Sequence, residues 1–301
     1  MNQRSSGKSS NNSPATDVMI VCALQAEAKP LISRFNLKFF KREYGFSLYM
    51  PNSFESEAEN NQALLVTGVG KVNMAAAMVW ANKLISAKAY LNVGIAGHGC
   101  LPIGEAVLIN QVKEEHVNTA TYPGVHFQWK KGVAKLMTVN SPSSDYDSEC
   151  MFDMEGSAFF DIASRFVSVE NVQLLKIVSD NKDNSYQQIN ADQVAELVEK
   201  RSSEIDIVLK ALIEQTTLVI GNSKTLFDAE GNVEHEILSM HQKWHISVSM
   251  EAKLRETYKV LSVMNDHSNQ VFPDWKEFDS PKAFLKSCQL WLNQVKPRLS
   301  K

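Results

Sequence analysis

The sequence predicts an α/β fold: a mixed, mostly parallel central sheet flanked by helices, with a helical C-terminal appendage. Short, continuous apolar runs rich in β-branched residues recur over the first two thirds of the chain. Helix-like stretches separate these runs, and strands that alternate with helices are typical of layered α/β domains. After about residue 216 the apolar runs give way to helical patterns joined by polar segments. These observations predict an α/β domain over residues 17–215 and a helical extension over residues 216–301.

The first strand is expected at residues 18–24, VMIVCAL, because an unbroken apolar run marks a strand that is buried on both faces. A helix follows at residues 26–35. Further strands are expected at residues 47–50 and in ALLVTGVG, residues 63–70. The alanine-rich run KVNMAAAMVWANKLIS comes next, and its composition and apolar spacing favour a helix.

The second half of the domain repeats this pattern. Strands are expected in AYLNVGIAG (89–97), AVLINQV (106–112) and VQLLKIVSD (172–180), and a helix begins at Glu155. The strongly periodic segment 191–215 predicts one long helix. Three more helices are expected in the extension, at residues 234–244, 249–264 and 280–295.

Composition and charge exclude several classes of function. The chain has 301 residues, of which 44% are hydrophobic and 22% charged, and this is enough apolar material for a large core. The formal net charge of −3 gives no electrostatic footprint for a phosphate backbone, so we expect no nucleic-acid partner. No apolar run approaches the roughly 18 to 20 residues that a membrane span requires, so we expect no membrane partner.

The N-terminal segment and the cysteines indicate the compartment. Residues 1–16 are polar, lack the apolar core of a signal peptide and are predicted to form a disordered tail. The four cysteines are scattered, without a CxxC pair or the spacing of a disulfide framework. We therefore expect a cytoplasmic protein without structural disulfides or a bound metal.

Three familiar motifs are not matched. GIAGHG at residues 94–99 has the spacing G-x-x-G-x-G, whereas dinucleotide-binding loops have G-x-G-x-x-G, and no phosphate-loop lysine follows it. HQKWH at residues 241–245 has two histidines at helical spacing, but Gln242 stands where a zinc protease has its glutamate. A helix face that carries two histidines is the favoured interpretation. The nucleophile-elbow motif of serine hydrolases, G-x-S-x-G, does not occur. We expect no cofactor.

Acids and glycines collect at the carboxyl ends of the predicted strands. Glu27 follows the first strand, TGVGK (67–71) and GIAG (94–97) end two central strands, Glu155 begins a helix, and Asp180 ends the last strand. Each has a local explanation on its own, because acids cap helices and glycines form tight turns. Ligands of open α/β sheets bind beyond the carboxyl ends of the strands, so together these features predict a site at that edge.

The chain resembles a known superfamily in five segments that follow one another in the family's order: ALQAEAKPL, TGVGKVNMAAA, NVGIAG, FDMEGSAFF and IVSDN. This is the purine nucleoside phosphorylase and nucleosidase superfamily, and the resemblance is closest to its methylthioadenosine/S-adenosylhomocysteine nucleosidases. It covers residues 17–215 and leaves residues 216–301 unexplained. The resemblance implies a nucleoside phosphorylase-like fold. It also implies a homodimer, because these nucleosidases complete the 5′ end of the pocket from a neighbouring subunit.

The resemblance implies roles for the DME segment. Glu155 matches the family's glutamate that accepts hydrogen bonds from the ribose 2′ and 3′ hydroxyls, and Met154 matches the methionine that packs against the sugar. An ionised carboxylate suits a vicinal diol because it offers two acceptor oxygens. Asp153 stands where the family often has glutamate, and no catalytic role is carried over to it.

The remaining site residues also follow from the resemblance. Asp180 matches the acid that protonates the departing purine near N7, and Ser179 is expected to orient its carboxyl group. Ala96 and Gly97 of the GIAG segment are expected to bind the substrate. Glu27 matches the carboxylate with which nucleosidases orient and deprotonate water.

The expected acceptor is water, although alternatives remain. Phosphorylases of this superfamily bind phosphate with glycines and arginines, and one arginine commonly lies just before the central glycine motif, where this chain has Asn92. A phosphate dianion without a guanidinium partner would be poorly compensated. Hydrolysis is therefore favoured over the alternatives, which are a phosphate-dependent phosphorylase and a catalytically inactive nucleoside-binding or regulatory module.

Two departures from the family concern the pocket. Residues 105–150 look shortened, and TVNSPSSDY is expected to occupy the place of a missing strand and loop. The family draws its base-stacking aromatic from this segment, and the candidates are Tyr146, Phe127 and Trp129. Ile95 replaces the family's serine, which indicates either another 5′ substituent or a pocket that no longer turns over its ancestral substrate.

The sequence thus predicts a cytoplasmic, homodimeric purine nucleoside N-ribosyl hydrolase. Its small-molecule partner is an adenosine-type nucleoside with a 5′ thio or other apolar substituent, and its product is adenine.

Overall fold

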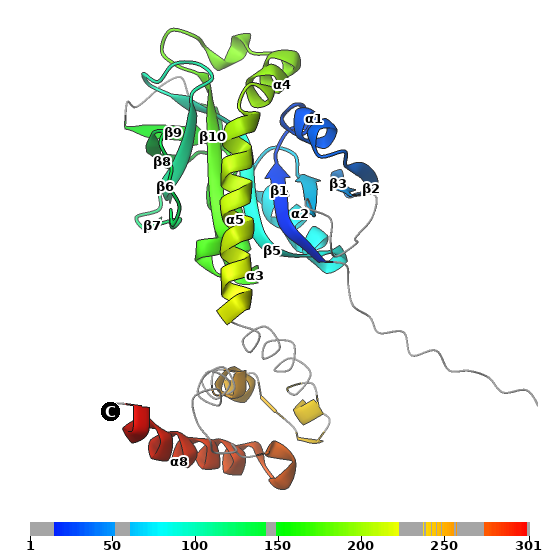
Figure 1. Ribbon diagram of the computed structural model, residues 1–301, viewed down its shortest axis with the longest axis vertical. Coiled ribbons are helices and arrows are strands. Elements are labelled where there is room, and N and C mark those ends of the chain that lie inside the picture. Colours follow the sequence, from blue (N-terminus) through cyan, green and yellow to red (C-terminus); the bar gives the residue numbers. More distant parts are fainter. Residues whose placement is uncertain are drawn as a thin grey trace, which may run out of the picture. The chain divides into compact units, whose positions relative to one another are not determined.

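The computed structural model describes residues 15–51, 61–142, 149–222 and 274–299, together with scattered positions between 237 and 257. The chain divides into two compact units, Met1–Thr216 and Thr217–Lys301. The first unit has the predicted α/β architecture, in which a mixed central sheet lies between two layers of helices (Figure 1). Residues 1–14 of the predicted tail lie outside the described residues. Its last two residues, Ala15 and Thr16, belong to the first strand.

The centre of the sheet is parallel. β1 (Ala15–Cys22) pairs with β4 (Gln62–Val66) on one side and with β5 (Ser86–His98) on the other. β5 also pairs in parallel with β10 (Val172–Asp180). The carboxyl ends of these four strands therefore lie at one edge, as the sequence analysis expected.

Beyond β10 the sheet closes on itself. β10 pairs antiparallel with β6 (Ala106–Glu114), which pairs in parallel with β8 (Val133–Thr138), and β8 pairs in parallel with β9 (Cys150–Asp153). β9 returns to the end of β5, where Gly97 lies opposite Phe152. The two-residue strand β7 (Ala120–Thr121) adds to β6. Because β5, β10, β6, β8 and β9 form a closed ring, most of their backbone groups find partners without a free edge.

The segment 105–150 contains more strand than its sequence pattern indicated. The strand β8 was not expected, and Thr138, at the start of TVNSPSSDY, is its last residue. Residues 143–148 of that segment lie outside the described residues, so the expectation that it occupies the place of a missing strand and loop stays a prediction.

At the other end, an antiparallel hairpin extends the sheet from β4. β3 (Phe46–Met50) pairs with β4, and β2 (Lys38–Glu43) pairs with β3. Tyr44 and Gly45 between them have φ of 53° and 89°, as the tight turn of a two-residue hairpin requires. β2 was not predicted because its residues are nearly all exposed and follow no apolar run.

Two helical layers cover the sheet, and the residues of β1 alternate between them. Met19 and Val21 face the layer of α2 (Lys71–Leu84) and α3 (Gly156–Phe166). The intervening residues of β1 face the layer of α1 (Gln25–Arg34), α4 (Ala191–Glu199) and α5 (Ser202–Asn222). Burial of both faces explains why the strand is an unbroken apolar run.

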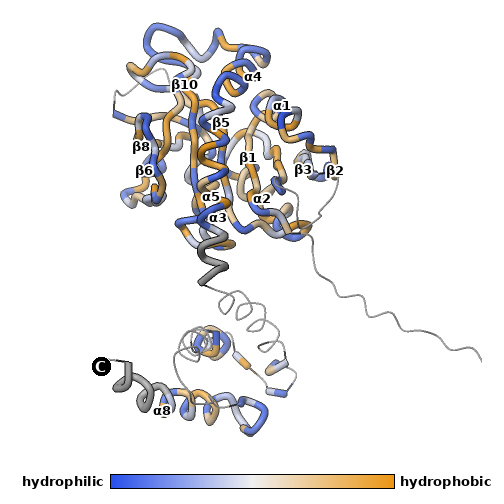
Figure 2. Tube along the Cα trace, viewed as in Figure 1, coloured by the Kyte–Doolittle hydropathy of each residue, from blue (hydrophilic) through white to orange (hydrophobic). Residues whose placement is uncertain are grey.

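The segment predicted as one helix over residues 191–215 forms two. α4 (Ala191–Glu199) ends before a turn at residues 200 and 201, and α5 (Ser202–Asn222) begins directly after it. The Arg201 Nε donates to the carbonyl of Gly104, and Ser202 Oγ donates to the carbonyl of Glu199 over 2.6 Å. Hydrogen bonds of this kind offer the backbone an alternative to the helical pattern. The helix is therefore interrupted although the apolar spacing of the sequence continues. Figure 2 shows hydrophobic and hydrophilic residues alternating along the coloured part of α5, as expected for a helix with one face on the core.

The C-terminal unit is helical over most of its described positions, and α8 (Pro281–Leu299) is its longest described element. The core formed by its described residues is rich in aromatic side chains. Trp244 packs edge to face on Trp275 with ring centroids 5.6 Å apart, and Phe284 and Trp291 are buried in the same cluster. Within the described part of the chain, no helix has the length and hydrophobicity needed to cross a bilayer.

Candidate functional site

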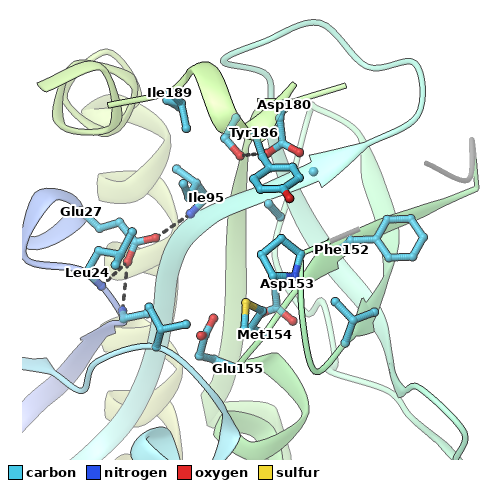
Figure 3. A pocket seen from close by; sticks show the side chains of 17 residues that line it. Leu24, Glu27, Ile95, Phe152, Asp153, Met154, Glu155, Asp180, Tyr186 and Ile189 are labelled. Carbon is cyan, nitrogen blue, oxygen red and sulfur yellow. Dashed lines mark hydrogen bonds between the residues drawn. The ribbon is translucent and has the colours of Figure 1, made fainter. Parts of the chain in front are cut away.

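A cavity of about 280 Å³ opens at the carboxyl ends of the central strands (Figure 3). Its volume is just below the roughly 300–1,000 Å³ that is typical of small-molecule sites, so a compact ligand would fill it. All seven residues that the sequence predicted for the site line it: Glu27, Ala96, Gly97, Met154, Glu155, Ser179 and Asp180. They come from α1, from the ends of β5 and β10, and from the junction of β9 with α3.

Glu27 is a buried acid held by backbone N–H groups. Its Oε2 accepts hydrogen bonds from the N–H groups of Ala23 over 2.9 Å and Leu24 over 2.8 Å, and its Oε1 accepts from Ile95 over 2.9 Å (Figure 3). Burial raises the pKa of Glu27, and these hydrogen bonds and the nearby Lys176 ammonium partly oppose that effect. A carboxylate can accept about four hydrogen bonds, so Oε1 retains room for one further donor.

A buried ion pair that was not predicted from the sequence lies beside the cavity. Lys176 Nζ is 2.8 Å from Asp153 Oδ2, and the two side chains are only 2% and 1% exposed. Asp153 also accepts 2.8 Å hydrogen bonds from Thr138 Oγ1 and from the N–H of Gly156. Burial lowers the pKa of Lys176, but attraction to Asp153 and the other nearby carboxylates raises it above its ordinary value. The sequence signal for this ion pair was Lys176 itself, because a lysine inside an apolar strand is buried and a buried lysine needs a charged partner.

Gly94 allows the charged groups to approach one another. It lies opposite Lys176 in the pairing of β5 with β10. A Cβ atom at position 94 would lie 3.0 Å from Glu27 Oε1 and 3.6 Å from Lys176 Nζ. A side chain there would therefore press on the Glu27 carboxylate, so the first glycine of GIAG is needed for close packing.

Glu155 and Met154 lie where β9 leads into α3. Glu155 Oε1 accepts a 2.6 Å hydrogen bond from the N–H of Gly70, whose φ of 99° is rarely adopted by residues with a side chain. Burial, and then the charge of Asp153, raises the pKa of Glu155 to about 7. No described residue donates a hydrogen bond to Glu155 Oε2, so that oxygen can accept from a ligand. The acid at the start of α3 thus faces the cavity as well as the helix.

Asp180 and Ser179 end β10 next to the GIAG segment. Ser179 Oγ donates a hydrogen bond to Asp180 Oδ1. The pairing with β5 shifts register between Val178, opposite Ala96, and Asp180, opposite Gly97. Such an irregularity changes the direction of the side chains that follow it.

The aromatic residues of the cavity differ from the predicted candidates. Phe152 and Tyr186 line it. Phe127 and Trp129 do not, because they pack on the core beneath α1, α4 and α5. Tyr146 lies outside the described residues. The missed signal for Tyr186 is an aromatic that follows Asp180 by six residues in an otherwise polar stretch.

The described residues contain no group of three histidine, cysteine or acidic side chains that is arranged to hold a metal ion. His241, from the HQKWH segment, has its Nε2 3.0 Å from Glu251 Oε2. His245 lies outside the described residues.

The comparisons with known proteins agree with the motif order. The family model described as the phosphorylase superfamily matches residues 17–147. No curated protein matches the chain. Among solved structures, a nucleosidase of 5′-methylthioadenosine and S-adenosylhomocysteine from S. pneumoniae, bound to a transition-state inhibitor, is similar at 17% identity with a TM-score of 0.50. That match covers 65% of this chain and 99% of the other.

Two further nucleosidases with the same two substrates in their names are similar in fold. The protein from Campylobacter jejuni has a TM-score of 0.51 at 15% identity, and the match covers 66% of this chain and 99% of the other. The protein from Colwellia psychrerythraea, in complex with adenine, has a TM-score of 0.51 at 14% identity, with 66% and 96% covered. The resemblance predicted from the motifs is therefore confirmed to this extent: residues 17–147 match the model of the phosphorylase superfamily, and the α/β unit has the fold of methylthioadenosine/S-adenosylhomocysteine nucleosidases.

Proposed function

We propose that the α/β unit hydrolyses the N-glycosidic bond of adenosine-type nucleosides and releases adenine. The observation that carries this proposal is the Glu27 carboxylate, which fills a cradle of three backbone N–H groups in the cavity that Glu155 and Asp180 also line. A nucleoside hydrolase needs a base for water, an acceptor for the sugar hydroxyls and an acid for the departing purine. The cavity offers one carboxyl group for each task.

In the proposed reaction the oxygen of a water molecule bonds to C1′ of the sugar while the bond from C1′ to N9 of the purine breaks. Glu27 orients the water and takes its proton, and a raised pKa suits a base that works near neutral pH. Asp180 gives a proton to the purine near N7, so adenine leaves as a neutral molecule. Glu155 accepts hydrogen bonds from the 2′ and 3′ hydroxyls, and Met154 packs against the sugar.

The cradle supports water over phosphate as the acceptor. The backbone N–H groups of Ala23, Leu24 and Ile95 already bind a carboxylate, and a phosphate in the same place would be repelled by it. Asn92, which stands where a phosphorylase has its arginine, is buried and donates through Nδ2 to the carbonyl of Val21 over 2.9 Å. It therefore does not replace a phosphate-binding guanidinium.

A purely nucleoside-binding module is less well supported. Binding the sugar requires hydroxyl acceptors such as Glu155, but it does not require a second buried carboxylate held in place by three hydrogen bonds. The apolar side chains of Val69 and Ile189 also line the cavity, and they fit a substrate with a thio or other apolar 5′ substituent.

The test is adenine release from methylthioadenosine, S-adenosylhomocysteine and adenosine, each with and without phosphate. If the protein is a hydrolase, it should release adenine and free sugar without phosphate. The rates with the three nucleosides then show which 5′ substituent is preferred. A strict requirement for phosphate would replace the hydrolase with a phosphorylase. Binding without any release would favour the regulatory module.

We also propose that the enzyme is a homodimer through α2. Val69, Val72 and Val79 lie along one side of this helix and its N-terminal loop and are 45%, 82% and 42% exposed. Val69 also lines the cavity, so a second copy seated on this stripe would lie next to the site. Light scattering should give the mass of a dimer, and Val72→Glu should shift it to the monomer, whereas a monomeric wild type would contradict the proposal.

The proposed location is the cytoplasm. The four cysteines are scattered along the chain, without a CxxC pair or the spacing of a disulfide framework, and this pattern favours a reducing compartment.

A further inference from the structure

The proposed function leaves open which side chain holds the purine ring. Phe127 and Trp129 pack elsewhere, and the aromatic residues that line the cavity within the described ranges are Phe152 and Tyr186. Tyr186 follows the proposed acid Asp180 by six residues. In Figure 3 the Tyr186 ring projects into the middle of the cavity, while the Phe152 ring lies farther to the side.

We propose that Tyr186 stacks on the purine base, so that one short stretch of chain, residues 180–186, both holds the base and protonates it. This inference rests on the proposed function and assigns the base subsite within it. The stretch follows β10, whereas the sequence resemblance placed the aromatic between β5 and the DME segment.

The backbone after Asp180 folds back so that Tyr186 returns to the cavity. The N–H of Asn181 donates to the carbonyl of Asn184 over 2.9 Å, and the N–H of Asn184 donates in return over 3.1 Å. Asn181 Oδ1 accepts hydrogen bonds from the backbone N–H groups of Asp183 and Asn184, at 3.1 and 3.0 Å, and from Asn184 Nδ2 at 3.0 Å. Asn181 Nδ2 donates to the carbonyl of Leu101 over 3.0 Å. The turn is thus tied to the sheet.

The chain is also held on the far side of Tyr186. A short 3₁₀ helix (Tyr186–Gln188) is followed by α4, whose first turn is closed by reciprocal hydrogen bonds between Asn190 and Gln193, at 2.9 and 3.0 Å. Both ends of the segment are therefore fixed before a ligand arrives, which lowers the entropy lost on binding. The Tyr186 side chain itself is only partly buried, so a ligand can cover its ring.

Base–aromatic stacking has a measurable size. Removing one such stack costs about 1–3 kcal/mol, which is a loss of affinity of about 5- to 150-fold. A phenylalanine at position 186 would keep the ring and lose only the hydroxyl group. The pair Tyr186→Ala and Tyr186→Phe therefore separates stacking from hydrogen bonding and from a general effect on the fold.

The experiment is calorimetric titration of adenine into the full-length chain and its variants, with thermal unfolding as the check on the fold. Tyr186→Ala should weaken adenine binding about tenfold or more, whereas Tyr186→Phe should stay within about twofold of the wild type. The matched control is Tyr122→Ala, because Tyr122 is 65% exposed and does not line the cavity. It should leave adenine affinity unchanged.

The outcomes separate this inference from the proposed function. If Tyr186→Ala bound adenine as tightly as the wild type, or if Phe152→Leu alone caused the loss, the assignment of Tyr186 would be overturned. A wild type that bound no adenine would overturn it as well. A wild type that bound adenine through Tyr186 but released none from any nucleoside would overturn the hydrolase and leave the base subsite in place.

Discussion

The two sides of the cavity are built in different ways. On the strand side the charged groups Glu27, Asp153, Glu155 and Lys176 are each 7% exposed or less, and they bind one another or backbone N–H groups. On the other side, residues 181–190 are mostly exposed and present Tyr186 and Ile189 from a short connection held by polar side chains. Charges gain strength where the sheet excludes water, while contacts that recognise the shape of a ligand need only a well-held loop. The strand side therefore suits chemistry, and the loop side suits recognition.

The largest expected effect is at Asp180, where the two sides meet. Asp180→Asn should lower the rate of adenine release about 1,000-fold, because an amide cannot give the proton that general acid catalysis requires. Nucleoside binding should stay within a few-fold of the wild type, since the side chain keeps its size. Steady-state release and calorimetry measure the two quantities. Asp183→Asn is the control in the same loop, and wild-type turnover by Asp180→Asn would show that the acid is another group.

The free energy of unfolding should fall far more when a charge is removed from the strand side of the cavity than when one is removed from the surface. Lys176→Met leaves Asp153 buried without its ammonium partner and should lower the free energy of unfolding by about 3–5 kcal/mol. The matched control is Lys135→Met, because Lys135 pairs with Glu149 at 49% and 73% exposure and such pairs contribute about 1 kcal/mol or less. Urea unfolding compares them. Equal losses of unfolding free energy in the two variants would mean that the buried ion pair stabilises the protein no more than the exposed one.

The same contrast explains what the sequence could and could not predict. The central strands and the positions of Glu27, Glu155 and Asp180 followed from apolar runs and motif order, because both are local in the chain. The ion pair between Asp153 and Lys176 joins β9 to β10, so no local pattern reveals it. The break at Arg201 depends on the distant carbonyl of Gly104. Long-range contacts of this kind require the fold to be known.

A pH titration tests the strand side through Glu155. Its pKa is raised from 4.5 to about 7 in the folded state, so between these values the folded protein binds more protons than the unfolded chain. The contribution of Glu155 to the free energy of unfolding is therefore largest at low pH and falls as the pH rises through this window. Sugar binding should change in the opposite direction, because the ionised carboxylate is the better acceptor.

Affinity for methylthioadenosine should therefore increase about tenfold between pH 6 and pH 8, and calorimetry at each pH measures it in the Asp180→Asn variant, which leaves the nucleoside intact. Glu155→Gln removes the titrating group and should bind weakly with little dependence on pH. An unchanged pH dependence in that variant would assign the titration to another group.

The smallest effect is expected on the loop side, at Asn181. Asn181→Ala removes the side-chain hydrogen bonds that hold the turn before Tyr186, so the loop must be ordered when the ligand binds. We expect adenine affinity to fall about fivefold, equivalent to about 1 kcal/mol, while thermal unfolding changes little. Asn181→Asp is the matched variant, because it keeps the oxygen that accepts from the backbone; it loses the donor to Leu101 and adds a carboxyl group beside Asp180. If Asn181→Ala instead lowered stability as much as Lys176→Met, the loop would belong to the same cooperative structure as the buried charges, and the two sides of the cavity would not be separate in function.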